Sequence, residues 1–294
     1  MKRRTEYIIF AIAAIIVIVG SLFSGEKFTF NHKQNDTINI GYNNYVESVA
    51  VVHLWKQLLE KKGYHVQLTQ SEKAPLYAGL ANGSVDVSPE VWLPTTDKPY
   101  YDKYKNQIEL HDAWYKGTNL GLVVPKYMKD INSIEDLNKH KKEFMRNGKP
   151  SIVGIDAGAS EMKLTQKVIK DYGLDFNLIQ SSESGMMSEL AKAYKDKKPV
   201  VVTLWNPHWA FNAYKLKYLK DPKNIYGKPE TIYYASRKGF KKDNPKVTKY
   251  LDQWYMTHKQ LGDLILKIEK SSPEKGAKQW IRENPDLVKK WLKD

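Results

Sequence analysis

The 294-residue sequence contains no cysteine. This absence excludes disulfide bonds, thiolate metal sites, a cysteine nucleophile and a lipid-modified cysteine after a leader. Arginine is also scarce, since five of the 47 basic residues are arginine and the rest are lysine. Nucleic-acid sites favour the arginine fork, whereas these lysines are spread along the chain and mixed with acids. The net charge of +14 therefore predicts a lysine-coated surface and no nucleic-acid partner. Contact of that surface with an anionic membrane face or cell-wall polymer stays open.

The chain also lacks the patterns of common enzyme and metal sites. It has no G-x-S-x-G or H-E-x-x-H motif and no pair of acids in a recognisable catalytic frame. No metal-ligand spacing links the seven histidines, at positions 32, 53, 65, 111, 140, 208 and 258. We therefore predict that the protein is not an enzyme and has no catalytic residue, no metal and no cofactor.

The first positive feature is an N-terminal segment typical of export. A basic stretch from Lys2 to Arg4 precedes 17 uncharged residues, Tyr7 to Phe23. This pattern predicts a targeting and anchoring segment over residues 1–35, with everything after it outside the cytoplasm. Because no cleavage site of the A-x-A type is present, the pattern favours an uncleaved anchor, and a cleaved signal is the alternative.

Beyond residue 35 the apolar pattern alternates between strand and helix periods. A first βαβαβ run has strands at 37–42, 65–69 and 83–94 and helices at 46–62 and 74–82. A second run has strands at 151–155, 177–180 and 200–205 and helices at 161–172 and 186–195. Extended segments at 120–126 and 232–236 are expected to cross between two lobes. Further helices are predicted to start at Ser133 and to span 245–261, 262–269, 273–283 and 285–292.

These runs predict an α/β protein with two sheet-based lobes. We expect residues 36–122 to form lobe 1 and residues 123–235 to form lobe 2. The helices of 236–294 are expected to pack on lobe 1 and complete it. A chain of this length can bury a sizeable core without disulfide staples.

Large aromatic residues follow the predicted strands at corresponding places. Trp92 and Trp205 each end an apolar strand shortly before a proline, and Tyr45 lies on the loop after the first strand. Ligands of open α/β sheets bind beyond the carboxyl ends of strands. Aromatic faces suit a quaternary ammonium, which has no N–H to donate. The pattern predicts that the two tryptophans sandwich a cationic ligand across a cleft with Tyr45 as a third face, whereas a plain core role is the alternative for each. His208 is expected to make a structural hydrogen bond, and Trp209 to pack behind the site.

Two kinds of polar group accompany these aromatics. The small-residue turn from Asp156 to Glu161 leads into a helix, so its exposed N–H groups form a predicted anion cradle. The alternative there is a simple N-cap by Ser160. Glu90 shares a face with Trp92 because strand residues two apart point the same way. Asp97 lies just beyond Trp92 and is the second candidate acid of the site. The alternative interpretation is that Asp97 is a solvated acid on a loop.

Seven segments together resemble a known family: 41–48, 91–96, 121–128, 133–137, 154–160, 205–209 and 216–223. They are similar to the glycine betaine, proline betaine, carnitine and choline-binding components of bacterial ABC importers, over essentially all of 36–294. The resemblance implies a two-lobed periplasmic-binding-protein (type II) fold that closes by a hinge. It also implies an aromatic cage formed by Tyr45, Trp92 and Trp205, with backbone N–H groups at Ser160 and Glu161 that hold a ligand carboxylate.

The sequence departs from this family pattern at three positions. Tyr45 stands where tryptophan is common, Asp97 where a carboxylate-binding histidine is expected, and Glu90 where a small residue is usual. Two acids there repel an anionic group, so they suit a cation with a hydroxyl group or without an acid group.

These features predict an extracytoplasmic receptor for a quaternary ammonium compound, and we expect it to be a monomer. Glycine betaine, choline and carnitine are the candidate ligands. The receptor is expected to be anchored or secreted at the outer face of the cytoplasmic membrane and to deliver its ligand to an ABC permease for osmoprotection or nutrient uptake. The alternative is a receptor of the same fold for another methylated amine or a non-quaternary cationic solute.

Overall fold

The computed structural model describes residues 37–293. These residues all belong to one compact unit. The predicted targeting segment at 1–35 lies outside the described residues, so it stays a prediction. Within the described part, no helix is long and apolar enough to cross a membrane.

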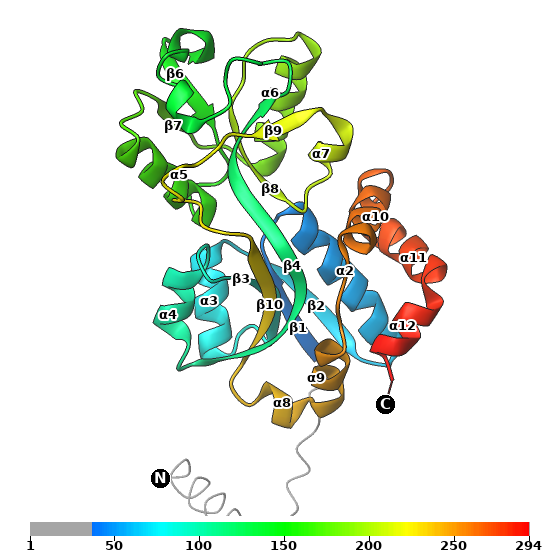
Figure 1. The fold of residues 1–294 in the computed structure, drawn as a ribbon. Coiled ribbons are helices and arrows are strands. Elements are labelled where there is room, and N and C mark those ends of the chain that lie inside the picture. The colour runs from blue at the N-terminus through cyan, green and yellow to red at the C-terminus, as the bar shows by residue number, and fades with distance from the viewer. Residues whose placement is uncertain (1–36, 294) are drawn as a thin grey trace, which may run out of the picture. The chain divides into compact units, whose positions relative to one another are not determined.

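Helices alternate with strands along most of the chain (Figure 1). The strands are β1 (Thr37–Tyr42), β2 (His65–Gln70), β3 (Val87–Leu93), β4 (Ile108–Pro125), β5 (Met145–Arg146), β6 (Lys149–Val153), β7 (Asn177–Ile179), β8 (Val202–Asn206), β9 (Leu216–Tyr218) and β10 (Glu230–Arg237). The helices are α2 (Val46–Lys61), α3 (Lys73–Asn82), α4 (Lys98–Tyr104), α5 (Ser160–Asp171), α6 (Glu183–Lys195), α7 (Ala210–Ala213), α8 (Phe240–Asp243), α9 (Pro245–Asp252), α10 (His258–Glu269), α11 (Pro273–Glu283) and α12 (Pro285–Trp291). Two 3₁₀ turns, η1 (Ile134–Asp136) and η2 (Lys141–Phe144), complete the list.

The first βαβαβ run is confirmed and forms the first half of the sheet. β1 pairs in parallel with β2 and β3. Helix α2 joins β1 to β2, and its apolar stripe, including Leu54 and Leu58, is fully buried. Because the strands are parallel, their carboxyl ends meet at one edge of the sheet. Tyr45 lies just beyond the end of β1, and Trp92 lies near the end of β3.

Two long antiparallel strands connect this half to the rest of the sheet. β10 pairs with both β3 and β4. The later part of β4 then pairs with β8 and β9, so this 18-residue strand runs through both halves (Figure 1). The predicted crossings at 120–126 and 232–236 lie in these two strands, but the antiparallel pairing and the first part of β4 were not predicted.

The second βαβαβ run is also confirmed and forms the second half of the sheet. β6 pairs in parallel with β7 and β8. The strand order across the whole sheet is β2-β1-β3-β10-β4-β8-β6-β5. Trp205 lies near the carboxyl end of β8, as expected.

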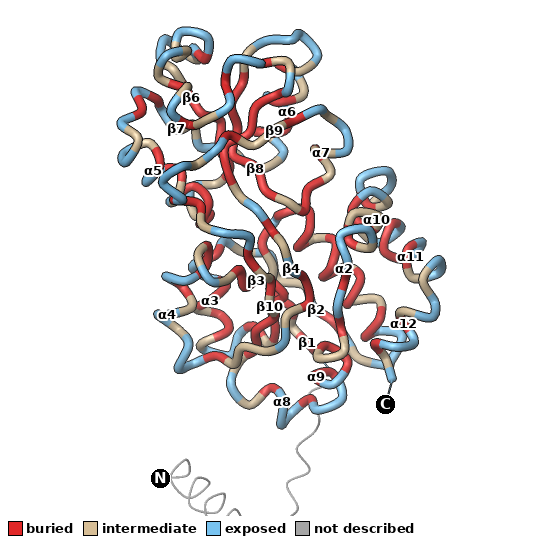
Figure 2. Tube along the Cα trace, in the orientation of Figure 1, coloured by how far each residue is buried: buried red, intermediate tan, exposed pale blue. Residues whose placement is uncertain are grey.

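The last helices pack against the first half of the sheet. Helices α10 and α11 both contact α2. The ring of Trp55 on α2 meets Trp254 edge-on at 5.5 Å and stacks with Trp291 at 6.3 Å. Figure 2 shows buried residues along the strands and the inner faces of these helices. These contacts agree with the expected arrangement, while the lobe boundaries themselves stay a prediction.

Two predicted helices differ from the structure. The helix expected from Ser133 is the single 3₁₀ turn η1, although its capping box is present. The helix expected over 245–261 ends at Asp252, and a new helix begins at His258 and runs through Gly262. The reason is local, because Thr257 and Gln260 form a capping box that starts α10.

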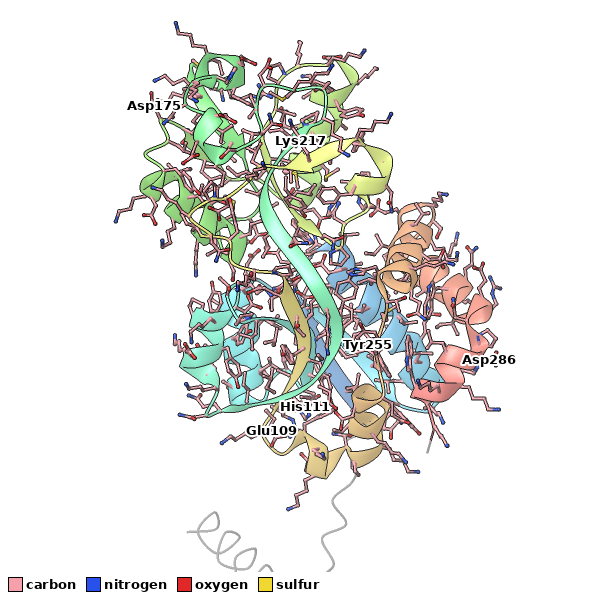
Figure 3. All side chains as sticks on the ribbon, in the orientation of Figure 1. Glu109, His111, Asp175, Lys217, Tyr255 and Asp286 are labelled. Atoms are coloured by element: carbon pink, nitrogen blue, oxygen red, sulfur yellow. The ribbon has the colours of Figure 1, made fainter. Side chains whose placement is uncertain are left out.

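The charged side chains lie mainly on the outside of the fold. Figure 3 shows them projecting from both halves, with Asp175 and Asp286 among the exposed acids. Many lysines there pair with neighbouring acids, as Lys141 does with Asp175. Such exposed pairs contribute little to stability, so the surface charge does not determine the fold.

Gly276 offers a test of the packing between α10 and α11. A Cβ added at Gly276 lies 2.5 Å from the backbone nitrogen of Ile268, which is too close without a helix shift. We expect Gly276→Ala to destabilise the protein by about 2 kcal/mol or more. The control is Gly262→Ala on α10, which meets open space and is expected to stabilise by about 0.5–1 kcal/mol. Urea unfolding measures both, and equal stability of the two variants contradicts the close contact.

Candidate functional site

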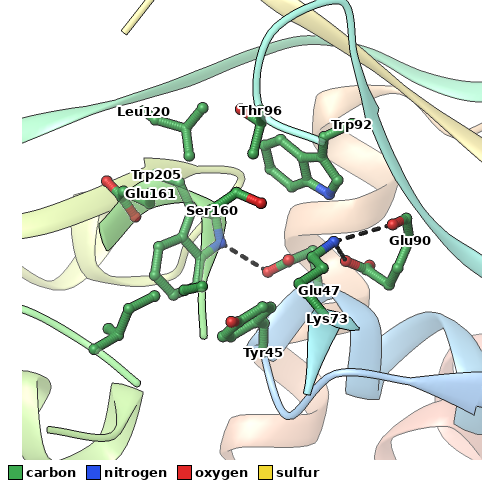
Figure 4. A pocket seen from close by; sticks show the side chains of 12 residues that line it. Tyr45, Glu47, Lys73, Glu90, Trp92, Thr96, Leu120, Ser160, Glu161 and Trp205 are labelled. Carbon is green, nitrogen blue, oxygen red and sulfur yellow. Dashed lines mark hydrogen bonds and ion pairs between the residues drawn. The ribbon is translucent and has the colours of Figure 1, made fainter. Parts of the chain in front are cut away.

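Twelve residues from both halves of the sheet line one cavity (Figure 4). The space in it that the centre of a water-sized molecule can occupy is about 30 Å³. The lining residues are Tyr45, Glu47, Lys73, Glu90, Trp92, Thr96, Leu120, Ile155, Ala159, Ser160, Glu161 and Trp205. Six of the seven residues predicted from the sequence are in this set, and Asp97 is not.

The three predicted aromatic residues surround the same space. The rings of Tyr45 and Trp205 meet edge-on, with centroids 5.5 Å apart. Trp92 approaches from β3, and all three side chains are buried. The Tyr45 hydroxyl donates a hydrogen bond to Asp156 Oδ2 at 3.0 Å, which ties the first half to the second. The strand ends therefore bring together the aromatic faces that the sequence predicted, while their contact with a ligand stays a prediction.

Glu47 fixes the orientation of Trp205. The indole N–H of Trp205 donates to Glu47 Oε2 at 2.8 Å. Glu47 lies in the first turn of α2 and is almost fully buried. Burial raises its pKa well above the usual value, the nearby Glu90 and Glu183 add to this rise, and the indole hydrogen bond opposes it. The sequence analysis did not identify Glu47 as a site residue, although its position two residues after Tyr45 was a usable signal.

Lys73 forms a buried charge cluster with two of the acids. Its ammonium lies 2.8 Å from Asp97 Oδ2, 3.5 Å from Glu90 Oε2 and 3.0 Å from the Glu90 carbonyl oxygen. Burial lowers the pKa of Lys73, but the carboxylates of Asp97 and Glu90 outweigh it, so the net pKa is raised. Burial likewise raises the pKa of Glu90, and Lys73 opposes this rise. Lys73 was not predicted, because one lysine among many gives no signal in the sequence.

Asp97 lies behind the cavity and is fully buried. Besides Lys73, its carboxylate accepts hydrogen bonds from the backbone N–H of Trp92 and from the Ser160 hydroxyl, both at 3.0 Å. The alternative of a solvated loop acid is therefore wrong. Asp97 connects the strand that carries Trp92 to the helix start in the second half, and its direct contact with a ligand stays a prediction.

The predicted anion cradle lies at the start of α5. Ala159 is the N-cap and offers no side-chain hydrogen bond, and the Ser160 hydroxyl is used by Asp97, so capping by Ser160 is not observed. The first N–H groups of a helix have no intrahelical acceptor, so they remain available at this end. The next side chain, Glu161, is buried and accepts from the Gly121 N–H at 3.3 Å. Burial raises its pKa to about 8.

Further contacts join the two halves beside the cavity. Glu183, the first residue of α6, accepts a hydrogen bond from the N–H of Val46 at the start of α2 at 3.0 Å. His208 Nδ1 accepts from the Ala210 N–H, so its Nε2 donates to Glu183, 3.0 Å away. The structural role predicted for His208 is confirmed. Trp209 lies outside the cavity and lines a separate hollow that also contains Glu183.

The arrangement suits the enclosure of a compact cation. It combines aromatic faces with buried carboxyl groups, and the ammonium of Lys73 is already neutralised by Glu90 and Asp97. Within residues 37–293, no group of three histidine, aspartate or glutamate residues could hold a metal ion. Thr96, Leu120, Ile155 and Ala159 are lining residues that the sequence analysis missed, because small and aliphatic residues carry no chemical signature.

The raised pKa of Glu161 makes a prediction for the stability of the ligand-free protein. The unfolded carboxyl has its ordinary value of 4.5, whereas the folded one titrates at about 8. The folded state therefore binds the extra proton, and stability falls as pH rises from about 4.5 to 8. Between pH 5.5 and 8.5, we expect wild type to lose about 3 kcal/mol relative to Glu161→Gln, measured by urea unfolding. If the free energies of unfolding of wild type and Glu161→Gln change in parallel with pH, Glu161 is not protonated in the folded state in the way expected here.

Comparison with known proteins places this geometry in a family. The family model for the substrate binding domain of ABC-type glycine betaine transport systems matches residues 36–283. A glycine betaine/carnitine transport binding protein of Listeria monocytogenes is 46% identical over 155 residues, which cover 51% of this chain and 52% of that relative. The matched region thus spans about half the length of that relative.

Two solved structures share the fold. Lactococcal OpuAC, in its closed form with glycine betaine, has a TM-score of 0.81 and 36% identity, and the match covers 87% of this chain and 99% of that one. A choline binding protein of an ABC transporter, in complex with choline, has a TM-score of 0.81 and 25% identity. That match covers 88% of this chain and 92% of the choline binding protein. The fold is that of the type II periplasmic binding proteins. The chain belongs to the family of substrate-binding domains of ABC-type glycine betaine transport systems.

Proposed function

We propose that this protein is an extracytoplasmic receptor that binds a quaternary ammonium compound and delivers it to an ABC permease. The observation that carries the proposal is that the rings of Tyr45, Trp92 and Trp205 line one cavity. Family membership supports it, because members are substrate-binding components of transporters. The same membership supports a role in binding without catalysis.

The cage can account for useful affinity. A quaternary ammonium is weakly hydrated, and each aromatic face contributes about 0.5–2 kcal/mol when water is excluded. Three buried faces together supply several kcal/mol beyond the burial of the methyl groups. After the costs of association, this fits binding in the micromolar range, that is, about −8 kcal/mol.

The contacts between the two halves suggest how the ligand is enclosed. We propose that the halves act as lobes, that β4 and β10 form the hinge, and that the described structure is the closed form. Tyr45–Asp156 and Val46–Glu183 then act as latches beside the cavity. A ligand that fills the cage favours the form in which these latches are made.

The remaining parts of the proposal concern place and partners. Residues 1–35 anchor or export the protein, so that the receptor works as a monomer at the outer face of the cytoplasmic membrane. Uptake serves osmoprotection or nutrition. A receptor for another methylated amine or a non-quaternary cation is the second candidate, since the buried carboxyl groups of Glu47 and Glu90 also suit such cations.

A thermal-shift panel with choline, tetramethylammonium, glycine betaine, carnitine and amino acids tests the proposal. At least one methylated ammonium should raise the melting temperature in a concentration-dependent way. Stabilisation by a primary amine and by no quaternary compound favours the second candidate. No stabilisation by any cation in the panel contradicts both.

The cage itself is tested by Trp92→Ala and Trp205→Ala. We expect each change to weaken binding by more than about tenfold, because a face of the cage is lost while the fold survives. The control is Trp209→Ala, which removes a tryptophan outside the cavity. Calorimetry with the tightest ligand of the panel measures all three, and wild-type affinity in both cage variants means that these tryptophans are only core residues.

The latch is tested by Glu183→Ala. Loss of the carboxylate removes the acceptor for the Val46 N–H, so we expect every ligand to bind about tenfold more weakly. The ratio of the affinities for different ligands should stay unchanged. Faster ligand release and a more open lobe arrangement in small-angle scattering should accompany the loss. Ser188→Ala, on the same face of α6, is the control. A change in ligand preference, or full affinity, argues against a latch.

A further inference from the structure

We propose that the cavity selects a monovalent cation that carries no carboxylate, and that Lys73 sets this preference. The inference rests on the proposed function and narrows it to one class of ligand. Choline and tetramethylammonium represent this class, whereas glycine betaine carries the same trimethylammonium head on a carboxylate.

Lys73 is already paired with acids of the protein. It is the one basic residue among those that line the cavity, and it is almost fully buried. A lysine ammonium has three hydrogens. Two of them are donated, to the Glu90 carbonyl oxygen at 3.0 Å and to Asp97 Oδ2 at 2.8 Å. The carboxylate of Glu90 forms an ion pair with the ammonium through Oε2 at 3.5 Å, without a hydrogen bond. The cation that a ligand carboxylate needs is therefore already held by the protein's own carboxylates.

Other side-chain donors of the site are occupied as well. The Ser160 hydroxyl donates to Asp97, the Tyr45 hydroxyl donates to Asp156, and the Trp205 indole donates to Glu47. The Thr96 hydroxyl oxygen is buried and has no hydrogen-bond partner among the described residues. One such hydroxyl matches the single hydroxyl of a choline-like ligand.

The charge around the cavity opposes an anionic group. Glu90 lines the cavity and Asp97 lies behind it, which places two carboxylates against the single ammonium of Lys73. The N–H groups at the start of α5 remain as an attraction for an anion. At that helix start, however, the carboxylate of Asp97 lies 3.0 Å from the Ser160 hydroxyl, and Glu161 follows immediately. A ligand carboxylate placed there lies beside the carboxylate of Asp97, which repels an anion and attracts a cation.

Calorimetry on the wild-type protein tests the preference with matched ligands. We expect choline to bind at least about thirtyfold more tightly than glycine betaine at pH 7.5, and tetramethylammonium also to bind more tightly than glycine betaine. Glycine betaine binding as tightly as choline, or more tightly, overturns this inference and leaves the proposed function intact. If no quaternary ammonium binds, the proposed function fails instead.

Variants connect the preference to these residues. Glu90→Gln removes one negative charge and keeps the Lys73–Asp97 pair, so the choline-to-betaine ratio should fall by about tenfold. Glu269→Gln removes the same charge from the separate hollow and is the control, with an unchanged ratio. If Glu90→Gln does not fold, Asp97→Asn provides the same test, since it removes the other carboxylate of the Lys73 cluster and its amide oxygen can still accept a hydrogen bond from Lys73. If the choline-to-betaine affinity ratio is unchanged in the variant that folds, the charge of these carboxylates does not determine the ligand preference.

Discussion

The burial of the Lys73 ammonium between Glu90 and Asp97 is the interaction on which the rest of the site depends. A charge in a protein interior is tolerated when it is paired and hydrogen-bonded, and removal of one partner of such a pair costs about 3–5 kcal/mol. Here the cluster joins the start of α3, strand β3 and, through Ser160, the start of α5. The same groups therefore hold the cage wall that carries Trp92 and determine which donors and charges a ligand meets.

The cage is also connected to the contacts between the two halves of the sheet. Tyr45 presents its ring to Trp205, while its hydroxyl donates to Asp156 in the second half. The next residue, Val46, donates its N–H to Glu183. A helix start favours a nearby carboxylate, so Glu183 is a suitable partner for the start of α2. One turn of chain thus supplies both a ring that lines the cavity and two contacts between the halves, so in the proposed function filling the cage and closing the halves would be coupled.

Sequence periodicity was sufficient for the two parallel βαβαβ runs, because buried parallel strands and their helices have local signatures. It also placed Trp92, Trp205 and Tyr45 at strand ends that meet. The antiparallel pairing of β10 with β3 and β4 was not predicted, since strand pairing over a long sequence separation leaves no local trace. Lys73 was missed for the same reason, because its neighbours Glu90 and Asp97 become visible only in the fold. Glu47 was missed because an acid in the first turn of a helix is common on any surface helix.

The position of the acids explains why they can coexist with a ligand site. Glu90 and Asp97 share Lys73, so they present less negative charge than two free carboxylates. Glu47 and Glu161 lack such a cation, and burial raises the pKa of both, with that of Glu161 reaching about 8. A cation that enters the cavity supplies the missing positive charge and lowers these pKa values again. If the proposed cation binds there, its recognition is therefore linked to the protonation of Glu47 and Glu161.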